Sequence, residues 1–367
     1  MEGRRPRLSQ SPPLLPPDAT GKAPDAGPFA VTTSVNLSST LRRDVCEMLM
    51  ESLRRRFGRW RWSVQTRVKY RLRHPKTLNE KIQYKMAFDR RPILTTFADK
   101  WAVREYVARK AGRHLLTEVY SLLTDPGDVA LASIPDRCVI KPTHGSGSVI
   151  LVDEHASEST LPDPATAGDW LFVKCRVRRR DLDQERLRRV VNHWLNSRYP
   201  MAQEWAYHNI TPQVFVEEYI DGQGAAPPAD YKFFVMHGKV AFIQVDMARF
   251  EGHRRQLFYP TWEPIPVDYV YPRPDALPQR PGRLKQMLDV ASILGEDTDF
   301  VRVDLYEAAG CVRFGELTNC PAAGRGSFSD ARFAKTLAES WIVPRSYASF
   351  PSTSVAQTAP RRGQDTD

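Results

Sequence analysis

The stretch CVIKPTHGSGSVILV, Cys138–Val152, places a lysine and a Gly-Ser-Gly turn between two apolar runs that are typical of buried strands. A lysine at the end of a buried strand is costly without a counter-charge, so we expect Lys141 to face an anion. Glycines let the main chain approach a ligand closely, so the turn His144–Gly147 can present backbone N–H groups to a phosphate. A glycine hairpin with a lysine that reaches solvent explains the same residues.

The composition restricts the class of protein but does not identify its binding partner. The chain has 367 residues, of which 41% are hydrophobic, enough for one large core or two to three smaller ones. A net charge of +10 favours anionic partners such as nucleotides, nucleic acid, acidic polymers or lipid headgroups. The five cysteines show no CxxC spacing, which predicts neither a disulfide framework nor a zinc site. With no apolar run long enough for a signal peptide or a membrane span, we expect a cytoplasmic protein.

Both ends of the chain are poor in large apolar groups, so residues 1–30 and 351–367 are predicted to be disordered tails. Leucine and valine at helical spacing predict a helix over 41–58, whose arginine-rich face is either solvated or a nucleic-acid site. A second helix is predicted from Asp99, with Trp101, Tyr106 and Val107 as its buried side and Gly112 after it. A third is predicted where apolar residues recur at helical spacing, at Leu187, Val190, Val191, Trp194 and Leu195.

Strand patterns follow in CVIKP, QVFVEEYI, YKFFVMHGKVAFIQVDMARF and FVRVDLYEAAGCVRFGEL. The last two read as hairpins, because apolar runs flank His237-Gly238 in one and the turn Glu307–Gly310 in the other. Hairpins pair their strands antiparallel, so we expect an α+β fold with an antiparallel central sheet.

Two acidic residues end apolar runs on the second hairpin, Asp304 in VRVDLY and Glu316 in RFGELTN. If both face the same side of adjacent strands, they repel each other unless a cation lies between them, and Mg²⁺ held by carboxylates and substrate phosphates is a common solution. The alternative is an ion pair of either acid with Arg302 or Arg313 on the same hairpin.

A third group of polar residues follows the apolar run in VEEYIDG, Val216–Gly222. It is either an edge strand with solvated glutamates or a hinge whose backbone contacts adenine and whose carboxylate binds the ribose. Further along, MARFEGHRRQLFY supplies positive charge that can balance a phosphoryl group in transfer, from Arg249, His253, Arg254 and Arg255.

Taken in order, these segments resemble the ATP-grasp fold, and more closely its TupA-like (teichuronopeptide biosynthesis) branch. The resemblance spans Lys76–Trp341 and rests on seven segments: TLNEKIQYKMAFDRR, FADKWAVREYV, VIKPTHGSGSVILV, EWAYHNITPQVFVEEYI, DYKFFVMHGKVAFIQV, FVRVDLY and FGELT. It implies an α+β fold in which antiparallel sheets with flanking helices hold a nucleotide between two lobes. The implied regions are a helical or α+β part over 31–98, a small lobe with a glycine-rich lid over 99–220, and a large lobe with the metal site over 221–350.

The resemblance also implies a role for each matching position. ATP would be bound by Lys100, Lys141, Gly145, Ser146, Gly147, Glu217, Glu218, Tyr219 and Ile220. Lys232 would add to the phosphate pocket, and Arg249 and Arg254 would stabilise the γ-phosphoryl group. Mg²⁺ would be held by Asp304 and Glu316, with Thr318 or Asn319 as a third ligand, because the asparagine of many ATP-grasp enzymes lies two residues after the glutamate.

The implied activity is ATP-dependent ligation. ATP converts a carboxylate to an acyl phosphate, which an amine attacks to form an amide, and the substrate class of this branch is a sugar or peptide carboxylate used in a cell-wall polymer. Cell-wall biosynthesis proteins and a membrane surface are candidate partners, and nucleic acid is not expected. Two features depart from the family pattern: the long segment Asp153–Gln184 has no assigned role, and Arg325 in CPAAGRGSFSD is either an acceptor clamp or solvated.

Two other classes of function remain open at this point. A glycosyltransferase of surface polysaccharides can also use paired acids, through a metal-bound nucleotide sugar. A non-catalytic basic module can bind nucleic acid or an anionic polymer through the helix at 42–55 and the run KCRVRRR, and its affinity would fall steeply with salt.

Overall fold

The computed structural model describes residues 74–156, 160–166, 170–200, 203–222, 228–247 and 252–347. The helix predicted over 41–58, the tails predicted over 1–30 and 351–367, and Arg249 lie outside these residues. None of the helices within the described ranges is both long and apolar enough to span a bilayer.

The first of two sheets, sheet A, has five strands in the order β1-β5-β2-β3-β4. The strands are β1 (Val119–Leu123), β2 (Cys138–Pro142), β3 (Val149–Val152), β4 (Lys174–Val177) and β5 (Val214–Glu218). Neighbours pair antiparallel except β3 and β4, which are parallel. Cys138 and Ile140 point into a core shared with helix α5 (Gln184–Asn196), so the alternation of side chains places Lys141 on the opposite face.

Sheet B has six antiparallel strands in the order β11-β10-β6-β7-β8-β9. The strands are β6 (Asp230–Met236), β7 (Lys239–Met247), β8 (Arg254–Phe258), β9 (Pro264–Ile265), β10 (Phe300–Ala308) and β11 (Cys311–Thr318). Both predicted hairpins are confirmed, and each closes on two residues of positive φ, His237-Gly238 (49° and 71°) and Ala309-Gly310 (50° and 71°). Two consecutive residues of positive φ are typical of the two-residue turn whose backbone twist matches the twist of the flanking strands.

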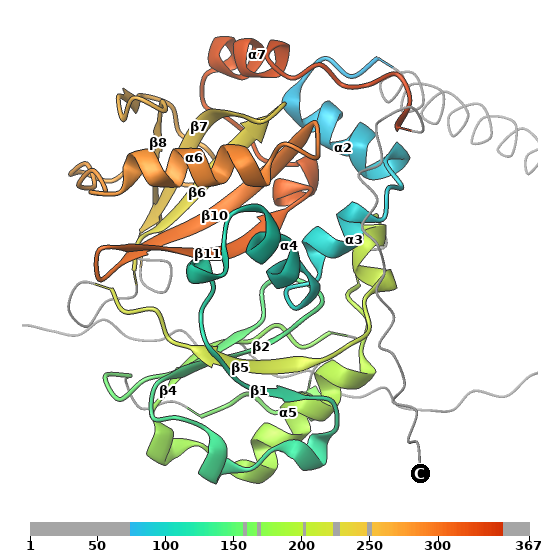
Figure 1. The fold of residues 1–367 in the computed structure, drawn as a ribbon, viewed down its shortest axis with the longest axis vertical. Helices are drawn as coiled ribbons and strands as arrows, with labels where there is room; N and C mark the ends of the chain where they lie inside the picture. The colour runs from blue at the N-terminus through green and yellow to red at the C-terminus, as the bar shows by residue number, and fades with distance from the viewer. Residues whose placement is uncertain are drawn as a thin grey trace, which may run out of the picture. The chain divides into compact units, whose positions relative to one another are not determined.

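The two faces of sheet B differ in character. Figure 1 shows α6 (Leu284–Leu294) crossing one face, which is apolar and also packs against α4 (Ala102–Lys110). Part of the other face packs against α2 (Leu78–Phe88) and α7 (Ala331–Glu339) through phenylalanines of the sheet. The rest of that face carries charged side chains, which supply half of the candidate site.

The family-like segment TLNEKIQ forms the start of α2, which a Thr77–Glu80 capping box initiates. Asn79 Nδ2 donates to the carbonyl of Gly326 at 2.6 Å, and Gln83 Nε2 donates to that of Gly324 at 3.0 Å. Helix α2 therefore fixes the loop after β11. The remaining short elements are α3 (Ile93–Ala98), η1 (Arg113–Leu115), η2 (Pro126–Asp128), η3 (Leu131–Ser133), η4 (Pro164–Thr166), η5 (Arg179–Asp181), η6 (Trp205–Asn209) and η7 (Pro321–Gly324).

Two sequence expectations change. Trp101 was expected to be buried, but its side chain is 37% exposed, because α4 begins only at Ala102 and Asp99 caps the turn before it. The unassigned segment 153–184 contains β4, the edge strand of sheet A. In its basic run, Arg176 pairs with Asp153 and Arg179 donates to the carbonyl of Ile134, so these arginines stabilise the fold.

Candidate active site

Lys141 meets the anion that its position in a buried strand requires. Its ammonium forms an ion pair with Glu217 and lies 5.2 Å from the centre of the Phe215 ring. β2 and β5 are neighbours in sheet A, which brings the two residues together although they are far apart in sequence. Glu217 also accepts a hydrogen bond of 2.8 Å from Thr117 and lies 3.6 Å from Arg104. Its carboxylate is thus held in place by three groups.

Lys100 connects the start of α4 to the predicted lid. Its Nζ donates to the carbonyl of Gly145 at 2.5 Å, and its backbone N–H donates to that of Thr143 at 2.9 Å. Burial lowers the pKa of Lys100, Glu316 of sheet B opposes this, and Lys141 lowers the pKa further. Because these groups act on one ammonium, both predicted nucleotide lysines and a predicted metal ligand lie within one electrostatic environment.

The glycine-rich lid packs against aromatic side chains. Gly145 and Gly147 both have φ of 79°, and a Cβ on Gly145 would lie 2.7 Å from the rings of Trp170 and Tyr199. Ser146 is exposed, and a hydrogen bond joins it to Tyr199. Gly145 therefore has no room for a larger residue, as expected of a loop that approaches a ligand through its main chain.

His144 belongs to the base of the lid. It is buried, its Nε2 lies 3.1 Å from the carbonyl of Ser197, and its ring meets that of Trp170 edge-on. Burial lowers the pKa of His144 to about 4, so the ring is neutral at physiological pH and supports the lid without adding charge for a phosphate.

The predicted hinge follows Glu217 at the end of β5. Glu218 accepts a hydrogen bond of 3.0 Å from the backbone of Glu118. Tyr219 is buried under the guanidinium of Arg137, and burial raises the pKa of its hydroxyl. Ile220 is partly buried. Of the four predicted hinge residues, Glu217 makes the direct contact with Lys141.

As expected, Asp304 and Glu316 face each other on adjacent strands, β10 and β11, and a β-bulge between Asp304 and Leu305 brings them directly opposite. Arg302 donates to both oxygens of Asp304, at 2.6 and 2.7 Å, and to Glu316 at 2.8 Å. The sequence left open an ion pair between an arginine and one of the two acids, whereas in the structure Arg302 bridges Asp304 and Glu316. Burial raises the pKa of Asp304, and Arg302 is the main group that opposes this rise.

Lys232 lies beside Asp304 on the neighbouring strand β6. Its Nζ is buried, donates to Asp304 at 2.5 Å and pairs with Asp230. Lys232, Asp304 and Glu316 thus form a row across three strands, with Arg302 lying over two of its members. Lys232 and Asp304 are buried and Glu316 is partly exposed, and a row of charges at the edge of a core is costly to assemble and fits a site that handles charged groups.

The candidates for a third metal ligand differ in position. Thr318 shares the face of Glu316 and donates to its carboxylate at 3.2 Å. Asn319 points elsewhere, because its Nδ2 donates to the carbonyl of Leu94 at 2.8 Å. No cluster of three His, Cys, Asp or Glu side chains suited to a metal occurs in the described ranges. A metal here would rely on Asp304, Glu316, Thr318 and the oxygens of a bound nucleotide, a set of hard donors that fits Mg²⁺.

Arg254 and Arg255 lie on opposite sides of β8. Arg254 is exposed and makes no hydrogen bond or ion pair with the described residues. Arg255 is buried and donates to Asp246 at 2.6 Å, and this arginine holds the pKa of Asp246 at about 2 against the effect of burial. The expected role of Arg254 in phosphoryl transfer stays a prediction, and Arg302 is the arginine that contacts the acidic pair.

Two groups in the site were not selected from the sequence. Arg302 was considered only as a neutralising partner, although its position two residues before Asp304 places both on one strand face. Glu204 carried no role, and only its place in the EWAYHNI segment marked it. Arg302 becomes visible through its contacts with both acids, and Glu204 through the small cavity that it lines together with residues distant in sequence.

Comparison with protein families gives one match. The family described as TupA-like ATP-grasp matches residues 80–342, which includes every candidate residue described above. Comparison with curated proteins found no match.

Solved structures similar to the chain are ligases. They include the ATP-grasp ligase PsnB complexed with minimal precursor (14% identity, TM-score 0.33, covering 69% of this chain and 59% of that chain). They also include D-alanine–D-alanine ligase from Bacillus anthracis complexed with ATP (17% identity, TM-score 0.34, covering 62% and 57%) and the D-cycloserine synthetase DcsG (17% identity, TM-score 0.36, covering 68% and 71%). The chain spans less than two thirds of the length of the first two ligases.

Proposed function

The chain belongs to the TupA-like ATP-grasp family, and we propose that it is an ATP- and Mg²⁺-dependent carboxylate–amine ligase. In this reaction ATP phosphorylates a carboxylate, and an amine displaces the phosphate to form an amide. The observation that supports the proposal is that Lys100 is held at the lid near Lys141 and Glu217, and that the charge of Glu316, which faces Asp304 on the neighbouring strand, acts on the same ammonium.

The lysines and the lid would bind the triphosphate. Lys141 and Lys100 are paired now with Glu217 and with the carbonyl of Gly145, both of which a phosphate can replace. Glu217 is then free to accept the ribose hydroxyls, while Glu218, Tyr219 and Ile220 line the base. The glycines of the lid would offer N–H groups to the phosphates.

Asp304, Glu316 and Thr318 would hold Mg²⁺, which when bound neutralises the charge on the phosphates. Arg302 is buried between the two carboxylates and can move its positive charge from them to the transferring phosphoryl group. We assign this role to Arg302 in place of Arg254. Lys232, like Arg302, lowers the pKa of Asp304 against the effect of burial.

The substrate would be a sugar or peptide carboxylate, and the product part of a cell-wall or surface polymer made in the cytoplasm. This part of the proposal rests on the family likeness alone. No observation in the described parts of the chain favours glycosyl transfer, and the arginines of KCRVRRR that bind within the fold weaken the basic-module alternative.

Calorimetric titration with ATP tests the proposal, with and without Mg²⁺. We expect binding in the micromolar range that weakens by roughly tenfold or more in Lys141→Ala and, in the presence of Mg²⁺ only, in Glu316→Ala. Lys174→Ala, an exposed lysine of β4, serves as the matched control. Binding of UDP-glucose in preference to ATP, or no ATP binding by the wild type, would contradict the ligase assignment.

The reaction itself is tested by ADP release with a panel of carboxylates that includes D-glucuronate and N-acetyl-L-glutamate, with hydroxylamine as the nucleophile. Hydroxylamine converts an acyl phosphate to a hydroxamate, so ADP and hydroxamate should form together in equal amounts. ADP released without hydroxamate would indicate simple hydrolysis of ATP.

A further inference from the structure

A small cavity lies beside the acidic row, and the proposed function leaves it without a role. Its volume is about 20 Å³, which is room for one water-sized group. Its lining residues come from α2, α3, η6 and the end of β11: Met86, Leu94, Glu204, Trp205, Ala206, Tyr207, Asn319 and Cys320.

Two hydrogen-bond acceptors of this cavity lack a donor. The carboxylate of Glu204 forms no hydrogen bond and no close ion pair with the described residues. Arg325 is the charged group that lowers the pKa of this carboxylate. Asn319 Oδ1 is buried without a hydrogen-bond partner, and the bond from its Nδ2 to Leu94 fixes the orientation of the amide. Asn319 Oδ1 is buried, and a buried acceptor left unpaired is costly; Glu204 is partly exposed and adds a second acceptor beside it, so together they indicate a group that donates several hydrogen bonds.

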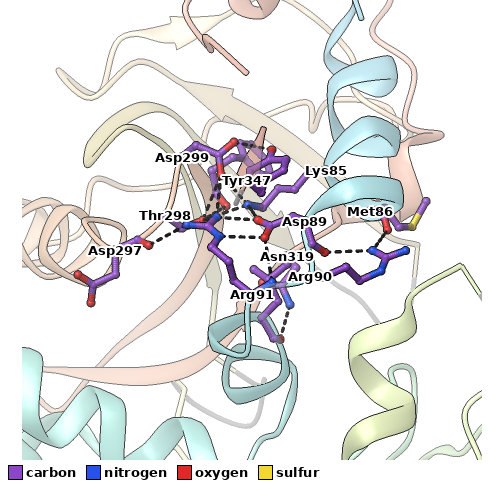
Figure 2. Close-up of polar contacts among 12 residues, drawn as sticks. Lys85, Met86, Asp89, Arg90, Arg91, Asp297, Thr298, Asp299, Asn319 and Tyr347 are labelled. Carbon is purple, nitrogen blue, oxygen red and sulfur yellow. Dashed lines mark hydrogen bonds and ion pairs between the residues drawn. The ribbon is translucent and has the colours of Figure 1, made fainter. Parts of the chain in front are cut away.

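The walls of the cavity are held by a network of buried charges, shown in Figure 2. The ammonium of Lys85 donates to Asp89 at 2.7 Å and to Asp299 at 2.6 Å, and all three side chains are fully buried. The carbonyl of Asp89 accepts a hydrogen bond of 3.1 Å from Trp205, the neighbour of Glu204. The charge network therefore fixes the segment that carries Glu204.

Two tyrosines connect the cavity to the reacting centre. The rings of Tyr199 and Tyr207 lie 4.8 Å apart, and burial together with Glu204 and Glu316 raises the pKa of both hydroxyls. Tyr199 is also bonded to Ser146 of the lid. The cavity therefore lies near both the lid and the acidic row, where a second substrate would approach the acyl phosphate.

We propose that this cavity binds the primary ammonium group of the acceptor, between Glu204 and Asn319, and that Glu204 takes the proton that must leave before the amine can attack. An ammonium group has three donors and no acceptor, which matches the two acceptors that lack a donor. Glu204 is the one acid among the lining residues, and the described residues form no group of three His, Cys, Asp or Glu side chains that would favour a metal instead. This inference rests on the proposed ligase function.

Each bond that forms in the proposed step is matched by a bond that breaks. One N–H bond of the ammonium breaks and an O–H bond forms on Glu204, which leaves a lone pair on nitrogen. The nitrogen forms a bond to the acyl carbon, the bond from that carbon to the phosphate oxygen breaks, and the second amine proton leaves with the phosphate. Burial raises the pKa of Glu204 to about 7, against the effect of Arg325, which suits a group that accepts a proton at neutral pH.

Glu204→Gln tests the inference, because glutamine keeps the size of the side chain and removes its charge and basicity. The assay compares two nucleophiles on the full chain, with the carboxylate that gives ADP release in the wild type. Glycinamide carries a primary ammonium group, whereas hydroxylamine is largely unprotonated at neutral pH and needs no base. Glu263→Gln, an exposed glutamate, is the matched control.

For Glu204→Gln we expect kcat/KM for glycinamide to fall by roughly 100-fold, while hydroxamate formation stays within about twofold of the wild type. An equal fall with both nucleophiles would show a structural role and overturn the inference, as would no fall with either. A wild type that forms no ADP and no hydroxamate with any carboxylate would overturn the ligase function and this inference with it. A wild type that forms hydroxamate but couples glycinamide equally well in both proteins would overturn the inference alone.

Discussion

Replacing Glu204 with glutamine should stabilise the fold at alkaline pH, although it removes a residue that we assign to the acceptor. In the folded chain, burial raises the pKa of Glu204 from 4.5 to about 7, and Arg325 opposes the rise. In the unfolded chain the carboxyl titrates near its ordinary value. Between these two pH values the folded state keeps a proton that the unfolded state releases, so the free energy of unfolding falls as the pH rises through this window.

The size of the effect follows from the two pKa values. One pKa unit corresponds to 1.36 kcal/mol, so the charged carboxylate costs the fold about 3 kcal/mol above pH 7. Burial raises the pKa values of the neighbouring Tyr199 and Cys320 to about 12 and that of Tyr207 well above its ordinary value, so these three groups do not titrate in this window. Glu204→Gln stays neutral throughout and should be more stable than the wild type by about 3 kcal/mol at pH 8, with no difference near pH 4.5.

Urea unfolding at several pH values, followed by tryptophan fluorescence, measures this difference. Glu263→Gln is the control, since Glu263 is exposed and its replacement should leave the pH dependence of the wild type unchanged. A Glu204→Gln variant whose stability has the same pH dependence as the wild type, or that is less stable at pH 8, would refute the reasoning. It would show that the carboxylate is solvated or paired in solution.

Three further predictions concern the other parts of the site. Gly145→Ala places a Cβ 2.7 Å from Trp170 and Tyr199 at a φ of 79°, so we expect a loss of about 1–3 kcal/mol in urea unfolding and a higher KM for ATP. Unchanged values would show that the lid opens away from both rings. Arg302→Lys keeps the charge but loses the two-pronged contact with Asp304, so kcat should fall by roughly 100-fold with little change in the KM for ATP, measured by ADP release. A change confined to KM would place Arg302 in nucleotide binding. Lys85→Met leaves Asp89 and Asp299 buried without their cation and should cost about 3–5 kcal/mol in urea unfolding, unlike the exposed control Lys174→Met. A loss near zero would mean that Arg91 neutralises both acids alone.

The elements that sequence predicted best are those set by local chemistry. Strand β2 has the predicted bounds, and both hairpins turn where a residue of positive φ is needed, at Gly238 and at Gly310. The second hairpin also predicted that Asp304 and Glu316 lie on adjacent strands, but their direct opposition depends on a β-bulge: without it, the register set at the turn would place Gly315 opposite Asp304. Local rules therefore placed the two acids on neighbouring strands, and the bulge decided which residues face each other.

Local rules could not predict which side chains these residues contact. Lys141 meets Glu217 only because β2 lies beside β5 in sheet A, and no local pattern states the order of strands. The choice between Arg254 and Arg255 depended on a single position of β8, and a shift of one residue moves a side chain to the other face of a sheet. The role of Arg302 needed the knowledge that one guanidinium reaches both acids.

Helix α2 shows why a long family-like segment can lack any nucleotide ligand. The residues of Thr77–Arg91 contact neither Lys141 nor the acidic pair, but Asn79 and Gln83 hold the loop after β11, and Lys85 and Asp89 fix the segment before η6. These two segments carry Arg325 and Glu204, the charged groups on the acceptor side. The nucleotide half of the site is thus built from neighbouring strands, whereas the acceptor half depends on a helix that binds both of its segments. Rigid support of this kind can hold the partly exposed carboxylate of Glu204 in place without a partner, since its neighbours fix the segment that carries it.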